Sequence, residues 1–136
     1  MIHFENVSKS FGRNLVLSNI NFKLEGPGVI AILGPNGSGK TTLIKSFLGM
    51  VLPDGGSIYW KGNVLKNRYF YRNDIGYIPQ IAHYPENLTV RELLKLIAGF
   101  REKSAESDRL IEIFRLKPYL SKRMGTLSGG TRQKVS

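Results

Sequence analysis

Apolar and polar side chains alternate loosely along the first 24 residues, which is typical of strands with one buried face. Residues 8–12 read Ser-Lys-Ser-Phe-Gly and predict a turn between two such strands. We therefore expect the chain to begin with short antiparallel strands. The apolar positions of this pattern are Ile2, Phe4, Val7, Leu15, Leu17, Ile20, Phe22 and Leu24.

A continuous apolar run at residues 29–33, Val-Ile-Ala-Ile-Leu, follows these strands. Such a run is typical of a strand covered on both faces in a parallel sheet. A glycine-rich turn at 34–39 comes next, and a helix is predicted over 41–50. Strand, glycine loop and helix are thus contiguous, and the predicted fold class is α/β.

The sequence pattern in the second half of the chain predicts short strands followed by helices. Strands are expected at 58–60 and 75–78, with a turn at 61–63 between them. Thr89 and Glu92 have the spacing of a capping box, so a helix is predicted to begin there, and another is expected from about residue 105 to 116. The sequence contains no internal repeat and no long linker, so one domain is expected.

Residues 34–41 read Gly-Pro-Asn-Gly-Ser-Gly-Lys-Thr and fit the phosphate-binding pattern G-x-x-x-x-G-K-[ST]. The glycines allow backbone N–H groups to converge on a polyphosphate without a Cβ collision, and the following helix adds its positive end. Lys40 is expected to bind the β- and γ-phosphates, and the Thr41 hydroxyl to bind Mg²⁺. The predicted nucleotide-binding residues of this loop, which bind ATP if the resemblance described next holds, are Gly34, Pro35, Asn36, Gly37, Ser38, Gly39, Lys40, Thr41 and Thr42.

A second glycine motif, Leu-Ser-Gly-Gly-Thr at residues 127–131, narrows the class of nucleotide-binding protein. Here the chain resembles the ATP-binding-cassette (ABC) ATPases, whose signature is L-S-G-G-Q, and the resemblance covers nearly all 136 residues in the family's order. It implies that two cassettes pair head to tail. Ser128, Gly129 and Gly130 of one cassette would then contact the γ-phosphate that the phosphate loop of the partner binds. Thr131 departs from the usual glutamine, but the serine and glycines supply the phosphate contacts.

The same resemblance assigns roles to two further residues. Gln80 is similar to the family's Q-loop glutamine, which reaches Mg²⁺ or the attacking water, and Phe11 is similar to the A-loop aromatic that stacks on adenine. It also implies three parts of one ATPase domain. These are a nucleotide-binding core with an antiparallel β subdomain (1–79), the Q-loop with a helical subdomain (80–126), and the signature with the start of its helix (127–136).

Hydrolysis in this family needs a Walker B strand ending in aspartate, a catalytic glutamate and a switch histidine, all after the signature helix. None of them occurs in these 136 residues. We therefore expect the chain to be the amino-terminal part of a longer ATPase, truncated before Walker B, and inactive in hydrolysis by itself.

The composition excludes several kinds of site and raises one alternative partner, nucleic acid. The absence of cysteine excludes disulfides, zinc–thiolate sites and catalytic thiols, and no apolar stretch approaches the roughly 18 residues of a membrane span. The net charge of +10 favours an anionic partner, and residues 61–136 contribute fifteen basic and seven acidic side chains to it. The basic, aromatic stretch at 66–72 is compatible with a nucleic-acid surface, although a solvated edge is the favoured interpretation.

The resemblance implies an ATP-binding subunit of an ABC transporter, of export type, with ATP and Mg²⁺ as cofactors. Its expected partners are a second ATPase subunit and an integral membrane subunit, and its expected location is the cytoplasmic face of the cell membrane. The alternative is a soluble ABC-type ATPase acting on ribosomes or nucleic acid, which is the less favoured prediction. If the chain were a small phosphate-loop kinase, the motif at residues 127–130 would have no role.

Overall fold

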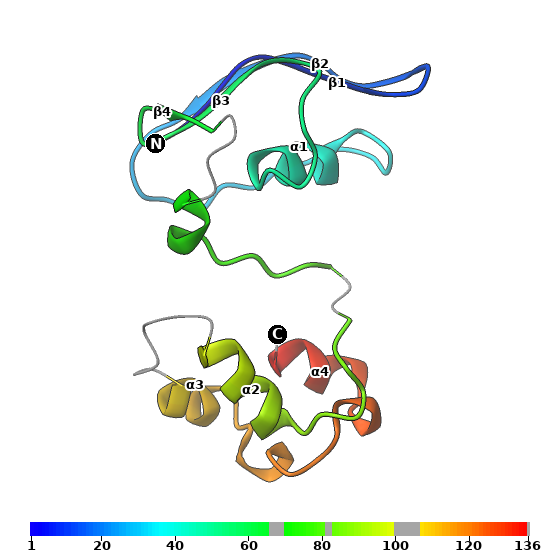
Figure 1. The fold of residues 1–136 in the computed structure, drawn as a ribbon, viewed down its shortest axis with the longest axis vertical. Helices are drawn as coiled ribbons and strands as arrows, with labels where there is room; N and C mark the ends of the chain where they lie inside the picture. The colour runs from blue at the N-terminus through cyan, green and yellow to red at the C-terminus, as the bar shows by residue number, and fades with distance from the viewer. Residues whose placement is uncertain (66–69, 81–82, 100–106, 136) are drawn as a thin grey trace. The chain divides into compact units, whose positions relative to one another are not determined.

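The computed structural model describes residues 1–65, 70–80, 83–99 and 107–135. They form two compact units, Met1–Ile75 and Gly76–Ser136 (Figure 1). Each unit has its own cluster of buried apolar side chains. The first cluster is Phe4, Val7, Leu17 and Ile58. The second is Val90, Leu93, Leu116, Met124, Leu127 and Val135.

A four-stranded antiparallel sheet of order β2-β1-β3-β4 forms the body of the first unit. Its strands are β1 (Ile2–Phe11), β2 (Asn14–Leu24), β3 (Gly55–Trp60) and β4 (Asn63–Val64). The antiparallel pairing predicted for the first 24 residues is confirmed, but the turn predicted at 8–12 is wrong. Within 8–12 only Gly12 has a left-handed backbone (φ 58°), so β1 continues to Phe11 before the chain reverses.

A bulge in β1 explains why two residues three positions apart share a buried face. Phe4 is 3% exposed and Val7 is fully buried, whereas strict alternation would place them on opposite faces. The pairing of β1 with β3 shifts register between Glu5 and Ser8, and Asn6 in this stretch has a left-handed backbone (φ 50°). The extra residue turns Val7 back toward the core.

Helix α1 (Lys40–Phe47) packs on the buried face of this sheet (Figure 1). Leu43 and Phe47 contact the first cluster, and the Phe47 ring lies 5.8 Å from Trp60 in an edge-on arrangement. The helix predicted over 41–50 is therefore confirmed, with its end at Phe47. A 3-10 helix at Phe70–Asp74 completes the unit, and its Tyr71 hydroxyl donates to the Phe47 carbonyl at 2.7 Å.

The apolar run at 29–33 does not form the predicted strand. Its side chains are exposed, with Val29 at 102% and Leu33 at 89% of full exposure. A parallel strand exists only with hydrogen-bonded neighbours, and no described segment pairs with this run. The strand expected at 75–78 is wrong for the same reason, since it pairs with none of the described strands.

Helices α2 (Val90–Gly99), α3 (Ser107–Ile113) and α4 (Gly129–Val135) form the second unit, with 3-10 helices at Lys117–Tyr119 and Met124–Thr126. The predicted capping box is confirmed, because the Thr89 amide donates to the Glu92 carboxylate at 2.8 Å and the Glu92 amide donates to Thr89 Oγ1 at 3.3 Å. The first of these bonds holds the pKa of Glu92 below its usual value. No helix in the described part of the chain is long and apolar enough to cross a membrane.

Helix α3 ends in a Schellman motif that carries an arginine where glycine is usual. The Arg115 amide donates to the Glu112 carbonyl at 3.0 Å, and the Leu116 amide donates to the Ile111 carbonyl at 2.8 Å. Arg115 has a left-handed backbone (φ 54°), a conformation in which a Cβ is unfavourable. The position therefore stores backbone strain.

Replacing this arginine should stabilise the second unit. We expect Arg115→Gly to raise the free energy of unfolding by roughly 0.5–1 kcal/mol, because the relieved strain exceeds the added backbone entropy of glycine. Urea unfolding followed by far-UV circular dichroism measures the change. The matched control, Arg109→Gly inside α3, should destabilise by about 1 kcal/mol. A loss of stability in Arg115→Gly would contradict the prediction.

Candidate functional site

The glycine loop at 34–39 leads directly into α1, and its shape depends on Gly39. Gly39 has a left-handed backbone (φ 86°), and a Cβ there would lie 2.8 Å from the Val16 carbonyl oxygen and 3.1 Å from the Leu17 side chain. Any other residue would push the loop away from β2. Gly37 is also left-handed (φ 84°), with open space around it. The loop therefore adopts a conformation that glycine permits, close against the sheet.

Lys40 turns its ammonium group back over the loop. Its Nζ donates to the Gly34 carbonyl at 2.8 Å and to the Pro35 carbonyl at 2.7 Å, with the Ser38 hydroxyl at 3.5 Å. An ammonium has three donors, and carbonyl oxygens are weaker acceptors than phosphate oxygens. The Lys40 ammonium thus already lies at the loop where it is predicted to bind phosphate.

The amino-terminal end of α1 is open to an anion. Its N-cap residue, Gly39, makes no side-chain capping bond, and the first turn carries no acidic residue. Backbone N–H groups at this end therefore lack the usual side-chain acceptors. Thr41 is exposed and Thr42 half-buried in this first turn. These features suit a bound polyphosphate, which would accept from the backbone amides of this turn.

Phe11 lies at the end of β1, opposite Asn14 of β2, and is 52% exposed. Two residues after Asn14, β2 touches the glycine loop at Val16. The structure therefore brings the β1–β2 hairpin and the phosphate loop to the same side of the first unit (Figure 1). The Lys9 ammonium lies 5.4 Å from the centre of the Phe11 ring. The sequence analysis missed this lysine, although residues two apart on a strand share one face.

Gln80 and the signature residues belong to the second unit. Gln80 is exposed, and Gly129 and Gly130 are exposed at the start of α4. The Ser128 hydroxyl lies 3.0 Å from the Thr131 hydroxyl and accepts from the Thr131 amide at 3.4 Å. Ser128 therefore caps α4 by bonding to Thr131, the residue that differs from the family signature.

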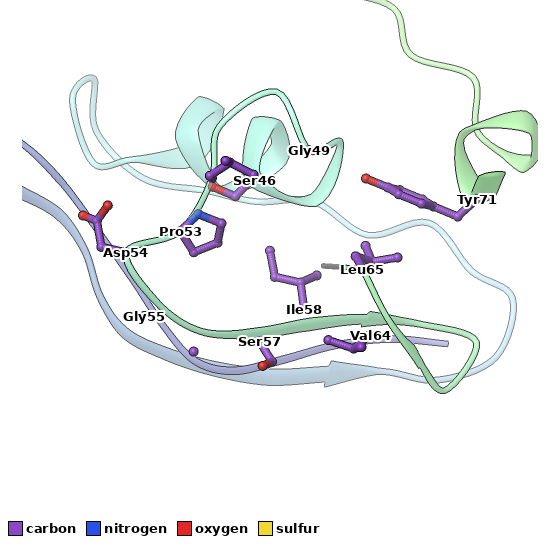
Figure 2. Close-up of a pocket in the computed structure, with 12 residues that line it drawn as sticks. Ser46, Gly49, Pro53, Asp54, Gly55, Ser57, Ile58, Val64, Leu65 and Tyr71 are labelled. Atoms are coloured by element: carbon purple, nitrogen blue, oxygen red, sulfur yellow. The ribbon is translucent and has the colours of Figure 1, made fainter. Parts of the chain in front are cut away.

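A pocket of about 390 Å³ lies between the carboxyl-terminal end of α1 and strand β3 (Figure 2). It adjoins the opposite end of α1 from the glycine loop, so it is separate from the candidate phosphate site. Its lining residues are Ser46, Gly49, Leu52, Pro53, Asp54, Gly55, Gly56, Ser57, Ile58, Val64, Leu65 and Tyr71.

The basic, aromatic stretch at 66–72 divides into a part outside the described residues, 66–69, and a described part that begins with Phe70. Phe70 is 88% exposed, whereas Tyr71 is buried and bonded to α1. Tyr71 therefore belongs to the packing of the first unit and is not a surface aromatic.

The chain is similar to one family over most of its length. The family model described as ABC transporter matches residues 17–136. Among similar proteins is the Nod factor export ATP-binding protein I of Burkholderia orbicola (strain AU 1054), which is 33% identical over 141 residues covering 99% of this chain and 46% of the relative. The protein of the same name from Rhizobium sp. (strain N33) gives the same identity and coverage. The chain thus spans about half the length of these relatives.

Solved structures show the same relationship. One described as the ATP binding subunit of an ABC transporter has a TM-score of 0.86 and 33% identity, covering 99% of this chain and 59% of the other. A second, described as the dimeric structure of MJ0796, a bacterial ABC transporter cassette, has a TM-score of 0.83 and 25% identity, covering 99% of this chain and 66% of the other. Both sequence and fold agree with the resemblance carried by the two glycine motifs.

Proposed function

Because the chain belongs to the ABC transporter family, we propose that it is the ATP-binding part of a subunit that powers transport by a separate membrane subunit. The phosphate loop carries this proposal. Its lysine lies against the loop carbonyls, and the helix behind it starts without a side-chain cap. Export is the proposed direction, supported by relatives named for Nod factor export.

ATP with Mg²⁺ fits the residues present. Lys40 and the first amides of α1 would bind the phosphates, Thr41 would offer a hydroxyl oxygen to Mg²⁺, and Phe11 would stack on the base. When bound, Mg²⁺ would neutralise phosphate charge. Gln80 as a second Mg²⁺ ligand rests on the resemblance alone.

We also propose that the working form is a head-to-tail pair with a second ATPase subunit at the cytoplasmic face of the membrane. Ser128, Gly129 and Gly130 would then contact the nucleotide of the partner. A similar solved cassette is described as dimeric, which supports pairing. Family membership implies ATP hydrolysis, but residues 131–136 contain no carboxylate that could orient a water molecule. We propose that these 136 residues bind ATP and do not hydrolyse it.

Isothermal titration with Mg²⁺–ATP, together with a phosphate-release assay, tests the proposal. We expect saturable binding of ATP and no phosphate release above the rate in buffer. Titration with a single-stranded RNA oligonucleotide at low and high salt tests the alternative. Salt-sensitive RNA binding by a chain that also binds ATP would favour the soluble ABC-type ATPase over the transporter subunit, whereas failure to bind ATP would reject both.

A further inference from the structure

Asp54, the residue before β3, bonds to three consecutive residues near the end of β1. Its amide donates to the Ser8 carbonyl at 2.9 Å. Its carboxylate accepts from the Lys9 ammonium at 2.7 Å and from the Ser10 amide at 2.7 Å. Figure 2 shows this carboxylate at the end of the pocket farthest from Tyr71. Asp54 thus joins the loop after α1 to the strand that ends in Phe11.

Lys9 links Asp54 to the Phe11 ring. Its side chain is only 16% exposed although Asp54 is 51% exposed, and its ammonium lies 5.4 Å from the ring centre. A cation at this distance attracts the π-face of an aromatic ring. One face of the Phe11 ring therefore lies near an ammonium that Asp54 holds in place, while Phe11 as a residue stays 52% exposed.

The same segment of β1 is connected to the phosphate loop through β2. Lys9 pairs with Leu17 in the β1–β2 ladder, and the Leu17 side chain lies next to Gly39. A change in the position of Lys9 would therefore alter the place of Phe11 relative to the loop. The hydrogen bond from the Lys9 ammonium and that from the Ser10 amide hold the pKa of Asp54 below its usual value.

We infer that Asp54 is a positioning residue for the base of the nucleotide: through Lys9 and the Ser10 amide it fixes the Phe11 ring so that its free face receives adenine. This inference rests on the proposed function, because it needs ATP at the phosphate loop. Asp54 acts on the base and contributes no contact to the phosphates. Loss of Asp54 should therefore weaken binding of ATP but leave binding of a bare polyphosphate unchanged.

The test compares Mg²⁺–ATP with inorganic tripolyphosphate, both titrated calorimetrically into wild type, Asp54→Ala, Phe11→Ala and the double variant. Since an aromatic stack contributes about 0.5–1.5 kcal/mol, we expect Asp54→Ala to weaken ATP binding about 2- to 12-fold. Tripolyphosphate affinity should not change. In the Phe11→Ala background, Asp54→Ala should cause no further loss, because the ring that it positions is already gone.

Two control variants separate positioning from folding. Asp54→Asn retains an acceptor for the Ser10 amide but loses the ion pair, so its ATP affinity should lie between wild type and Asp54→Ala. Glu25→Ala removes another exposed, lysine-paired carboxylate, that of the Lys23–Glu25 pair, and should leave both affinities unchanged. Circular dichroism checks that each variant is folded.

Two outcomes would overturn the inference. Equal losses of ATP and tripolyphosphate affinity would mean that Asp54 supports the loop as a whole. Additive losses in the double variant would mean that Asp54 acts independently of Phe11. A wild-type chain that binds neither ligand would instead reject the proposed function, so the two failures are distinguishable.

Discussion

Lys40→Ala is expected to weaken ATP binding roughly 10- to 150-fold, the largest functional effect that a single substitution should produce in this chain. A hydrogen bond to a charged group contributes about 1.5–3 kcal/mol, and Lys40 is the only loop residue that can offer a positive charge to the phosphates. The substitution would leave the Gly34 and Pro35 carbonyls without the ammonium that now donates to them. It would also remove the positive charge that neutralises the phosphates. Calorimetric titration with Mg²⁺–ATP measures the loss.

The matched control is Lys45→Ala, which removes the same charge from the same helix but in its last turn. Its effect on ATP affinity should be small, because the charge lies at the far end of α1 from the loop and is screened by salt. Equal losses in the two variants would show that net charge, not the position of Lys40, determines binding. An unchanged affinity in Lys40→Ala would refute the phosphate site itself.

The second large effect concerns stability, and it comes from Gly56 of β3. Gly56 lies opposite the bulge in β1 and has a left-handed backbone (φ 80°). A Cβ there would overlap backbone atoms of Asn6 and Glu5, which cannot move aside as a side chain can. We expect Gly56→Ala to lower the free energy of unfolding by roughly 2–5 kcal/mol, the sum of backbone strain and overpacking.

Urea unfolding measures this loss, and the neighbouring glycine supplies the control. Gly55 is the preceding residue in the same strand, has an ordinary backbone, and would offer open space to a Cβ. Gly55→Ala should therefore change the unfolding free energy by less than about 0.5 kcal/mol. Similar losses in the two variants would argue against the close approach of β3 to the bulge.

Local patterns predicted the elements that carry the candidate phosphate site and one helix cap of the second unit. The glycine loop, the helix that begins at Lys40 and the capping box of Thr89 and Glu92 depend on residues close in sequence, and the structure contains all three. The antiparallel pairing of β1 and β2 was also predictable, because the two strands are joined by a short turn.

The failures involve features that a local pattern does not encode. The run at 29–33 has the composition of a buried strand, yet a strand also needs neighbours elsewhere in the sequence. The bulge at Asn6 follows from the need to bury both Phe4 and Val7, which is a property of the packed sheet. Asp54 reads as a turn residue after Pro53, and its three bonds to β1 span more than forty residues.

Trp60 gives this chain a useful spectroscopic property. It is the only tryptophan in the sequence, and it packs edge-on against Phe47 in the first unit. Its emission should therefore report melting of the sheet and α1, while far-UV circular dichroism also follows the helices of the second unit. If Gly56→Ala shifts the emission midpoint in urea and Arg115→Gly moves only the circular dichroism signal, the units unfold separately and no single unfolding free energy describes the chain.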